Sequence, residues 1–317
     1  MSDACALAVD LGGTQLRTAI VDRSGAIRAH AVTATKAQDG PTAVIAQIVA
    51  AIRALRATAP ACAVLGLGVG APGPLDPIAG ISIAPPTLAG WHDVPLAALL
   101  EEQLGIAVTV ENDANAAALG EWRFGAGSGT SSMVFVTVST GIGGGVIADG
   151  RLLHGRRGLA AEIGHMTIAD DSDEPCFCGV RGCWESLASG SALDRRAARL
   201  AASGAAPRLL ELAGAGPVTG HHVTQAAMQG DPQAKALLAA AARWLGVGIV
   251  NLLHLYSPER VVVGGGLGSC LELLQGGIDD VVRARAMPAY REVPVVPAQL
   301  GLQAGLVGAA SLVFAGR

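Results

Sequence analysis

Apolar residues follow two spacings along this chain, and the two spacings alternate. Short apolar runs of the length of a buried strand occupy residues 64–70 and 106–110. Longer stretches repeat their apolar residues at helical spacing and predict helices over residues 41 to about 58, 96–104, 114–122, about 188–202 and 232–255. A loop rich in proline and glycine is predicted over residues 71–90. Strands that alternate with helices indicate α/β layers.

Two further segments share a hairpin pattern with glycine at the bend. Residues 6–22 hold two β-rich runs around Leu-Gly-Gly-Thr, and residues 134–149 hold two around Thr-Gly-Ile-Gly-Gly. Glycine at such a bend lets backbone N–H groups approach a bound anion. Neither bend is a Walker loop, because no Gly-Lys-Ser/Thr follows it. Ordinary tight turns are the alternative, but the repetition predicts two related domains that each supply a phosphate-binding hairpin to a shared cleft.

A third glycine cluster, residues 264–266, follows the apolar run 260–263. A strand that ends in glycines lets a flat nucleoside lie against the backbone. A plain loop is the alternative interpretation of this cluster.

Composition limits the partners that this chain can have. Apolar residues make up 51%, aromatic residues only 3%, and glycine occurs 43 times, so the core must be built from Ala, Val, Leu and Ile. The net charge is −4 and no Lys/Arg run occurs, which argues against a nucleic-acid partner. Arg243, Asn251 and His254 interrupt the apolar stretch 236–256, so we expect a buried helix and no membrane span.

Three cysteines and a histidine lie between two glutamates. His165, Cys176, Cys178 and Cys183 are the ligand set of a closed, structural zinc site, with Glu162 and Glu185 two or three residues from a ligand. Such a zinc would leave no open position for water and would instead orient the two carboxylates toward a polar substrate. Free core thiols or a partial disulfide set are the alternatives.

The other three cysteines stand alone in apolar stretches. Cys5, Cys62 and Cys270 are interpreted as small buried side chains. The N-terminal residues lack the basic region of a secretory signal, so we expect a reducing, cytoplasmic setting and no disulfide bonds.

The segment Glu111-Asn-Asp-Ala-Asn115 is predicted to end a strand and open a helix. Asn and Asp are preferred helix N-caps, so capping alone accounts for part of this segment. It holds more cap-competent residues than one cap needs. Asp113 is therefore a candidate base that accepts a proton from a substrate hydroxyl.

Together these motifs resemble the ROK family of sugar kinases and repressors over nearly the whole chain. They are Asp10-Leu-Gly-Gly-Thr14, Glu111-Asn-Asp-Ala-Asn115, Ser139-Thr-Gly-Ile-Gly-Gly-Gly145, Glu162-Ile-Gly-His165 and Cys176-x-Cys-Gly-x-x-Gly-Cys-x-Glu185. The bacterial ROK glucokinases are most similar, with N-acetylmannosamine kinases nearby. The resemblance implies a two-domain actin/hexokinase-like (ribonuclease H-like) α/β fold with an interdomain active site.

The expected small domain is 1–113 with a C-terminal helix of about 303–317, and the expected large domain, which carries the zinc loop, is 114–302. The hinge between them is expected near residues 113–127. ATP, Mg²⁺ and a structural Zn²⁺ are the implied cofactors, and a homodimer or homotetramer is the implied assembly.

The resemblance also assigns roles to single residues. Asp113 matches the catalytic base. Sugar contacts are implied for Gly73, Thr87, Asn112, Asp113, Glu162, His165 and Glu185. Nucleotide contacts are implied for Asp10, Gly12, Gly13, Thr14, Gln15, Thr140, Gly141, Gly143, Gly265 and Gly266, with Asp10 holding the metal through water. The zinc ligands are His165, Cys176, Cys178 and Cys183.

The implied reaction is transfer of the γ-phosphate of ATP to the 6-hydroxyl of a hexose. Glu162 is the residue expected in a site for glucose. A threonine at position 87 instead resembles the N-acetylmannosamine kinases, so N-acetylmannosamine or another aminosugar or hexose is the alternative substrate. Polyphosphate as the donor also remains open.

Three positions depart from the family pattern. Thr87 stands where glucokinase-like members often have Asn. Gln15 stands where many relatives carry Lys, with Arg17 nearby. Ala161 replaces the usual Gly, a change expected to be tolerable because it adds only a methyl group.

Two other classes are disfavoured. A ROK repressor needs a DNA-binding segment before the first hairpin, and the first strand is expected at about residue 5. A non-catalytic sugar-binding module would not need Gly13 or Asp113.

Overall fold

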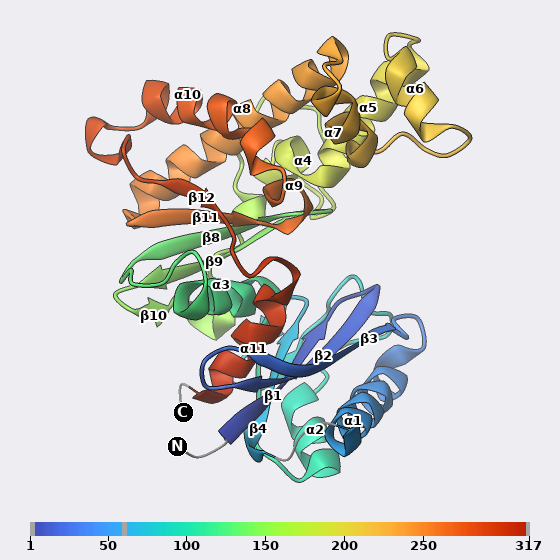
Figure 1. Ribbon diagram of the computed structural model, residues 1–317, viewed down its shortest axis with the longest axis vertical. Coiled ribbons are helices and arrows are strands. Elements are labelled where there is room, and N and C mark those ends of the chain that lie inside the picture. The colour runs from blue at the N-terminus through green and yellow to red at the C-terminus, as the bar shows by residue number, and fades with distance from the viewer. Residues whose placement is uncertain (1–3, 59–61, 315–317) are drawn as a thin grey trace. The chain divides into compact units, whose positions relative to one another are not determined.

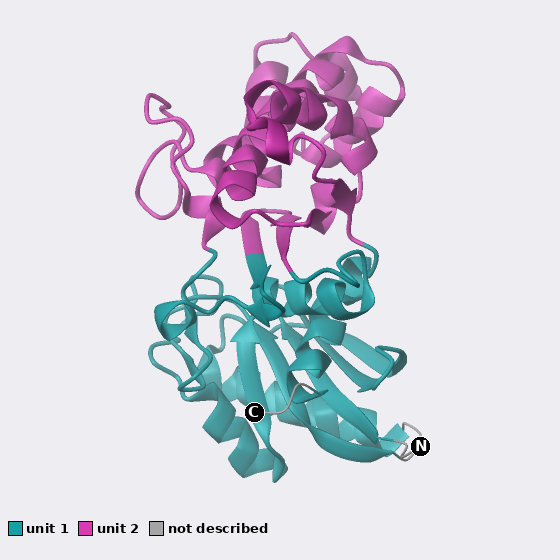
Figure 2. Cartoon of the chain, turned by 90° about the vertical axis from the view of Figure 1, so that its left-hand side faces the viewer, with its two compact units in different colours: residues 1–131, 145–161, 299–317 teal, residues 132–144, 162–298 magenta. Residues whose placement is uncertain are grey.

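The computed structural model describes residues 4–58 and 62–314, which form two compact units. Unit 1 comprises residues 1–131, 145–161 and 299–317, and unit 2 comprises residues 132–144 and 162–298 (Figure 2). These units differ from the division predicted at residue 113, because residues 114–131 and 145–161 belong with the N-terminal residues. The end of the predicted C-terminal helix, residues 315–317, lies outside the described residues.

Unit 1 is built on a five-stranded sheet in the order β3-β2-β1-β4-β7. The strands are β1 (Ala4–Leu11), β2 (Gln15–Asp22), β3 (Ile27–Ala34), β4 (Ala63–Ala71) and β7 (Val108–Asn112). Strand β1 pairs antiparallel with β2, with Leu7 opposite Ile20, which confirms the first hairpin. On its other side β1 pairs parallel with β4, and β4 pairs parallel with β7.

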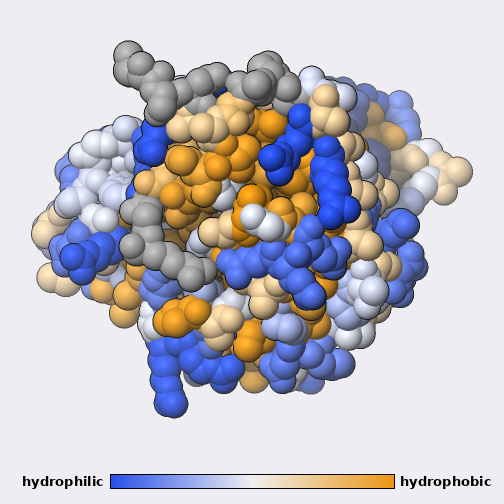
Figure 3. Space-filling model, turned by 90° about the horizontal axis from the view of Figure 1, so that it is seen from below, coloured by the Kyte–Doolittle hydropathy of each residue, from blue (hydrophilic) through white to orange (hydrophobic). Residues whose placement is uncertain are grey.

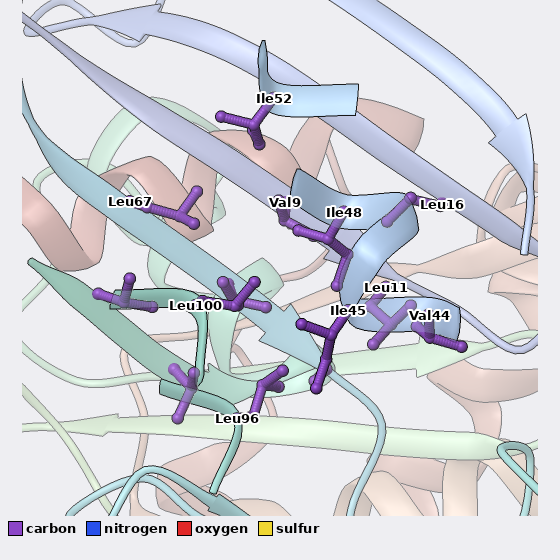
Figure 4. Packing of buried hydrophobic residues seen from close by; sticks show 14 of the residues in the cluster. Val9, Leu11, Leu16, Val44, Ile45, Ile48, Ile52, Leu67, Leu96 and Leu100 are labelled. Atoms are coloured by element: carbon purple, nitrogen blue, oxygen red, sulfur yellow. The ribbon is translucent and has the colours of Figure 1, made fainter. Parts of the chain in front are cut away.

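The two faces of this sheet carry different cores. Alternate residues of β1 point to opposite faces, and Leu7, Val9 and Leu11 face α1 (Gly40–Thr58) and α2 (Leu96–Leu104). Figure 4 shows Val9 and Leu11 of β1 together with Ile48 of α1 and Leu100 of α2 in this core. On the other face Ala6 and Ala8 pack against α11 (Ala304–Phe314). Figure 1 shows α11 next to this sheet. Both helices over the first face match the predicted ranges within a residue.

Helix α3 (Asp113–Phe124) belongs to unit 1 because it packs closely on α11. A Cβ at Gly308 would overlap the Ala116 carbonyl, and one at Gly120 would lie 2.6 Å from the Ala304 oxygen. Only glycine permits this approach of two helix backbones. The predicted division placed α3 in the other domain, because sequence spacing carries no sign of this contact.

The second five-stranded sheet has the order β10-β9-β8-β11-β12. Its strands are β8 (Met133–Val138), β9 (Ile142–Ala148), β10 (Arg151–Leu152), β11 (Arg260–Gly264) and β12 (Val295–Pro297). Strands β8 and β9 are neighbours, as the second hairpin predicts, and β11 pairs parallel with β8 and β12. The boundary between the units falls within β9. Two short strands, β5 (Leu75–Asp76) and β6 (Ile81–Ser82), lie in the predicted proline-rich loop.

Helices make up most of the rest of unit 2. They are α4 (Trp184–Ala188), α5 (Gly190–Ala202), α6 (Pro207–Ala213), α7 (Gly220–Met228), α8 (Pro232–Tyr256), α9 (Gly265–Gly268) and α10 (Gln275–Arg285). Helix α8 is the one helix among the described residues that is long and apolar enough to cross a membrane. More than half of its most apolar stretch is buried, and the fully buried Trp184 indole packs on its backbone at Gly248, as expected of a core helix.

Hydrophobic residues also reach the surface of the molecule. Figure 3 shows a face on which they gather, with hydrophilic residues around them. The exposed large hydrophobic residues of unit 1 include Val32, Leu65 and Ile78. Exposed apolar atoms are a normal part of any folded surface and indicate no partner by themselves.

A disulfide bond joins Cys5 and Cys62, so the expectation of no disulfide is wrong for this pair. Cys5 lies at the start of β1 and Cys62 directly precedes β4, its parallel neighbour, which brings the two Cα atoms to 6.1 Å. The four other cysteines are free thiols. The sequence separation of 57 between the partners hides this proximity in the sequence.

Candidate active site

Hydrogen bonds within the turn and from Thr35 hold the turn between β1 and β2 in place. The Gly12 N–H donates to the Gln15 carbonyl at 2.9 Å, which closes the turn. The Thr35 hydroxyl donates to the Gly12 carbonyl at 2.7 Å, and its N–H donates to the Thr14 carbonyl at 2.9 Å. A Cβ at Gly13 would lie 2.8 Å from the Thr87 Cβ. Unit 1 therefore brings a predicted phosphate residue against a predicted sugar residue.

Asp10, at the end of β1, shares its carboxylate with Arg17. The Arg17 Nη1 lies 3.3 Å from Asp10 Oδ2, and Arg17 Nη2 donates to Gln15 Oε1 at 2.9 Å. Burial raises the pKa of Asp10, and the Arg17 guanidinium partly offsets that rise. A carboxylate in this environment gains from a nearby cation, as a role beside Mg²⁺ requires. Arg17 also supplies a positive charge close to the position where Gln15 replaces Lys.

The junction of β7 and α3 separates capping from the candidate chemistry. The Asn112 side-chain oxygen accepts hydrogen bonds from the N–H groups of Ala114 at 2.9 Å and Asn115 at 3.1 Å, so Asn112 is the N-cap. Asp113 is the first residue of the helix, is half-buried, and accepts from the Ala114 N–H at 2.8 Å. The cap is thus supplied without Asp113, which leaves an additional carboxylate at the helix start, near β4 at Gly70.

A contact between the buried Glu111 and the partly exposed His154 supports this junction, and sequence reasoning missed it. Glu111 is 2% exposed, and its Oε2 lies 2.7 Å from His154 Nε2. Its other oxygen accepts from the Asn112 N–H at 2.9 Å and from the Asn115 side-chain amide at 3.0 Å. The hydrogen bond to Glu111 raises the pKa of His154. Glu111 stands inside a motif that was singled out, but nothing in the sequence links it to a histidine 43 residues later.

The second glycine turn, in unit 2, lies directly on Glu185. The Ser139 N–H donates to the Gly141 carbonyl at 2.9 Å, and the Ile142 N–H donates to Glu185 Oε2 at 2.9 Å. A Cβ at Gly141 would overlap the Glu185 carboxylate. Unit 2 therefore joins a predicted phosphate turn to a predicted sugar residue. The Thr140 carbonyl accepts from Ser191 on α5, which anchors the turn to the helix behind it.

The four predicted zinc ligands converge on one point. The Nδ1 atom of His165 lies 3.5 Å from Cys176 Sγ, and the sulfurs of Cys178 and Cys183 lie 3.7 Å apart. All four ligand atoms fall within 4.8 Å of one another. Ligands at tetrahedral angles around zinc lie roughly 3.5 Å apart. The cluster therefore fits a four-coordinate zinc with no open position.

The pKa values of the three cysteine thiols bear on whether the cluster can bind a cation. Burial raises the pKa of Cys183 to about 12 and also raises that of Cys176. A hydrogen bond from the Val180 backbone N–H lowers the pKa of Cys178. Because zinc binds the thiolate form, a bound cation would supply the charge that stabilises three deprotonated sulfurs side by side.

Two features tie this cluster to the predicted sugar residues. Cys176 Sγ lies 3.9 Å from Glu185 Oε1, the carboxylate that also holds the second glycine turn. Glu162 precedes a 3₁₀ turn, Ile163–His165, in which the His165 N–H donates to the Glu162 carbonyl at 3.1 Å. The loop that would bind a metal therefore also positions Glu162 and Glu185.

Ala161 adopts φ +65°, a left-handed conformation that side chains with a Cβ rarely take. The reason given for tolerance, that only a methyl group is added, is therefore incomplete. The backbone angle rather than the size of the side chain favours glycine here.

The remaining predicted residues occupy loops and strand ends. Gly265 has φ +82° and begins α9, and a Cβ there would lie 2.5 Å from the Val138 carbonyl, whereas Gly266 faces open space. Gly143 lies on β9, and Gly73 follows β4 and precedes a cis peptide bond to Pro74. The predicted residues thus form two groups. The first, in unit 1, is Asp10 to Gln15, Gly73, Thr87, Asn112 and Asp113; the second, in unit 2, is Thr140, Gly141, Gly143, Glu162, Glu185, Gly265, Gly266 and the zinc ligands.

Comparison with known proteins places this chain in one family. The sequence profile of the ROK family matches residues 6–315. A glucokinase of Halalkalibacterium halodurans is 36% identical over 317 residues, which cover 99% of this chain and 96% of that protein. An N-acetylmannosamine kinase of Escherichia coli is 38% identical over 96% of this chain and 97% of its own length.

The structure of a ROK family glucokinase from Streptomyces griseus in complex with glucose and AMPPNP aligns with a TM-score of 0.86 and 37% identity. The alignment covers 98% of this chain and all of that one. The resemblance drawn from the motifs and the predicted two-domain actin/hexokinase-like α/β fold are both confirmed.

Proposed function

The chain belongs to the ROK family, and from that premise we propose that it is an ATP-dependent kinase that phosphorylates the 6-hydroxyl of a hexose. Glucose is the first candidate, because full-length glucokinases are among its relatives. The observation that carries the proposal is the start of α3, where Asn112 caps the helix and Asp113 remains as a carboxylate beside it.

The proposed reaction assigns a task to each group of residues. The Asp113 carboxylate takes the proton of the 6-hydroxyl as that oxygen attacks the γ-phosphorus of ATP. A new P–O bond forms to the sugar, the bond to the bridging oxygen breaks, and ADP leaves. The Gly12 amide closes its own turn, so the backbone amides that hold the phosphates are those of Gly13 in the first turn and of Thr140–Gly141 in the second. Mg²⁺, held with the help of Asp10, would neutralise charge on the phosphoryl oxygens.

The sugar contacts follow from atoms that the scaffold leaves available. Asn112 uses its side-chain oxygen for the cap, so its NH₂ group is the part that would donate to a sugar hydroxyl. Glu162, Glu185 and His165 would bind further hydroxyls from unit 2. A structural zinc at His165 and the three cysteines would keep these groups in place without taking part in the reaction.

N-acetylmannosamine is the second candidate substrate. A threonine at position 87 is a feature shared with that group of kinases. Thr87 packs against Gly13, so its position is fixed relative to the first turn. A relative that is 38% identical over nearly the full chain carries that activity in its name. We further propose a homodimer or homotetramer in the cytoplasm, as the resemblance implies.

An ATP-coupled assay with glucose, N-acetylmannosamine, N-acetylglucosamine, mannose and fructose tests the proposal. We expect kcat/KM to be highest for glucose, and polyphosphate in place of ATP tests the donor. Highest kcat/KM with N-acetylmannosamine would favour the second candidate. Absence of phosphorylation with all five sugars would contradict the kinase assignment.

A further inference from the structure

Glu111 is a buried carboxylate that the proposed reaction does not use. It is 2% exposed and stands on β7, two residues before Asp113. Removal of a carboxylate from water costs several kcal/mol unless a charge and hydrogen bonds compensate it. Groups that compensate the Glu111 carboxylate are therefore expected at the β7–α3 junction.

His154 is the partner of this carboxylate and compensates its charge when the ring is protonated. It follows β10 within unit 1, and its Nε2 lies 2.7 Å from Glu111 Oε2. Its side chain is 40% exposed, so the ring bridges the buried carboxylate and solvent. The same contact raises the pKa of His154, which favours the protonated ring.

The other oxygen of Glu111 holds the residues that surround the candidate base. It accepts from the Asn112 N–H and from the side-chain amide of Asn115, a residue that is 1% exposed. Asn112 in turn caps α3 through the N–H groups of Ala114 and Asn115. A continuous set of hydrogen bonds therefore runs from His154 through Glu111 to the first turn of α3, which carries Asp113.

We propose that His154 is a positioning residue for phosphoryl transfer: by pairing with Glu111 it fixes the β7–α3 junction and thereby the place of Asp113. This inference rests on the proposed kinase function. Without the imidazole, Glu111 Oε2 would lose its hydrogen-bond partner, and the buried carboxylate would turn toward water. That movement weakens the hydrogen bonds that hold Asn112 and Asn115.

Because a shift of about 1 Å in a reacting group can cost roughly 100-fold in rate, we expect His154→Ala to lower kcat by about 10- to 100-fold. The KM for ATP should stay within about twofold, because none of the hydrogen bonds of Glu111 reaches either glycine turn. His154→Gln, which keeps a hydrogen-bond donor, should retain more kcat than His154→Ala and covers the case in which the alanine variant folds poorly.

Arg157→Ala is the matched control. It removes another ion pair of the same segment, Arg157 Nε to Asp76 Oδ2 at 3.3 Å, and leaves the hydrogen bonds of Glu111 to His154, Asn112 and Asn115 in place. We expect its kcat to stay within about twofold of the wild type.

A double-mutant cycle tests whether His154 acts through Glu111. Glu111→Gln removes the buried charge, so His154→Ala in that background should lower kcat by less than about threefold. Hydrogen exchange at Ala114 and Asn115 should speed up in His154→Ala and not in Arg157→Ala.

The outcomes separate the two proposals. If the wild type phosphorylates none of the sugars, the proposed function falls, and this inference falls with it. If the wild type is active and His154→Ala keeps kcat within twofold, or if the two substitutions lower kcat independently, only the role of His154 is overturned.

Discussion

The two units hold their predicted site residues by different physical means. In unit 1, Asn112 and Asp113 are fixed by a helix cap and by the buried Glu111–His154 pair. In unit 2, Glu162 and Glu185 are fixed by a loop whose thiols and imidazole converge to metal-binding distances. The first arrangement depends on hydrogen bonds along a strand–helix junction. The second would depend on the zinc that we propose for this loop. Perturbations should therefore separate the two halves of the site.

Asp113→Asn should have the largest effect on the unit 1 half. A base of this kind contributes on the order of 10²- to 10⁴-fold, so kcat should fall by about that factor. The amide keeps the shape and the acceptor for the Ala114 N–H, so the affinity for the sugar should stay within about threefold. Steady-state kinetics and calorimetric sugar binding check this; turnover equal to that of the wild type would remove Asp113 from the role.

Gly141→Ala should disturb the unit 2 half. The added Cβ would overlap the Glu185 carboxylate and push it away from the Ile142 N–H. We expect kcat/KM for the sugar to drop by about 100-fold, since Glu185 would be displaced by about an ångström.

Gly276→Ala on α10 is its matched control, because a Cβ there meets nothing within 4 Å. Its activity should equal that of the wild type. Equal losses in the two variants would contradict the contact between the second turn and Glu185.

Removal of the Cys5–Cys62 bond should change stability and leave both halves of the site alone. The bond lies at the start of β1, whereas Asp10 lies at its end. Closing a loop of this length stabilises a protein by about 2–4 kcal/mol. Urea unfolding of Cys5→Ser/Cys62→Ser should show that loss with kcat unchanged. Titration of six free thiols in unreduced, unfolded protein would show that the bond does not form.

Ala161→Gly should have the smallest effect, and a favourable one. It relieves a left-handed backbone at an alanine, which costs about 1–2 kcal/mol, although glycine gives back part of this in unfolded-chain entropy. We expect a net gain of about 1 kcal/mol in the free energy of unfolding, measured by urea titration. A loss of stability would mean that the methyl group makes a contact worth more than the strain.

The sequence predicted what is local in this molecule. Helix α2 spans the predicted residues, and α1 and α8 differ by a single residue at one end. Both glycine turns lie at strand ends, as predicted. They could be predicted because short apolar runs and glycines carry a strong local signal. The sequence could predict that the four candidate zinc ligands lie close together, because their spacing along the chain already limits how far apart they can be.

What the sequence could not predict is contact between distant segments. The Cys5–Cys62 bond and the Glu111–His154 pair join positions 57 and 43 residues apart, and neither has a spacing rule. The close approach of α3 and α11 depends on Gly120 and Gly308, whose role is visible only once the two helices are packed. For this reason the predicted boundary at residue 113 cut α3 from the unit in which it lies.

The metal content of the purified protein tests the difference between the two halves most directly. We expect one zinc per chain by elemental analysis, and its loss in Cys183→Ser. Sugar affinity should weaken when the metal is lost, while hydrogen exchange at Ala114 and Asn115 in unit 1 should stay unchanged. Protein that is active and contains no zinc, or a loss of zinc that leaves sugar affinity intact, would contradict a metal-held half of the site.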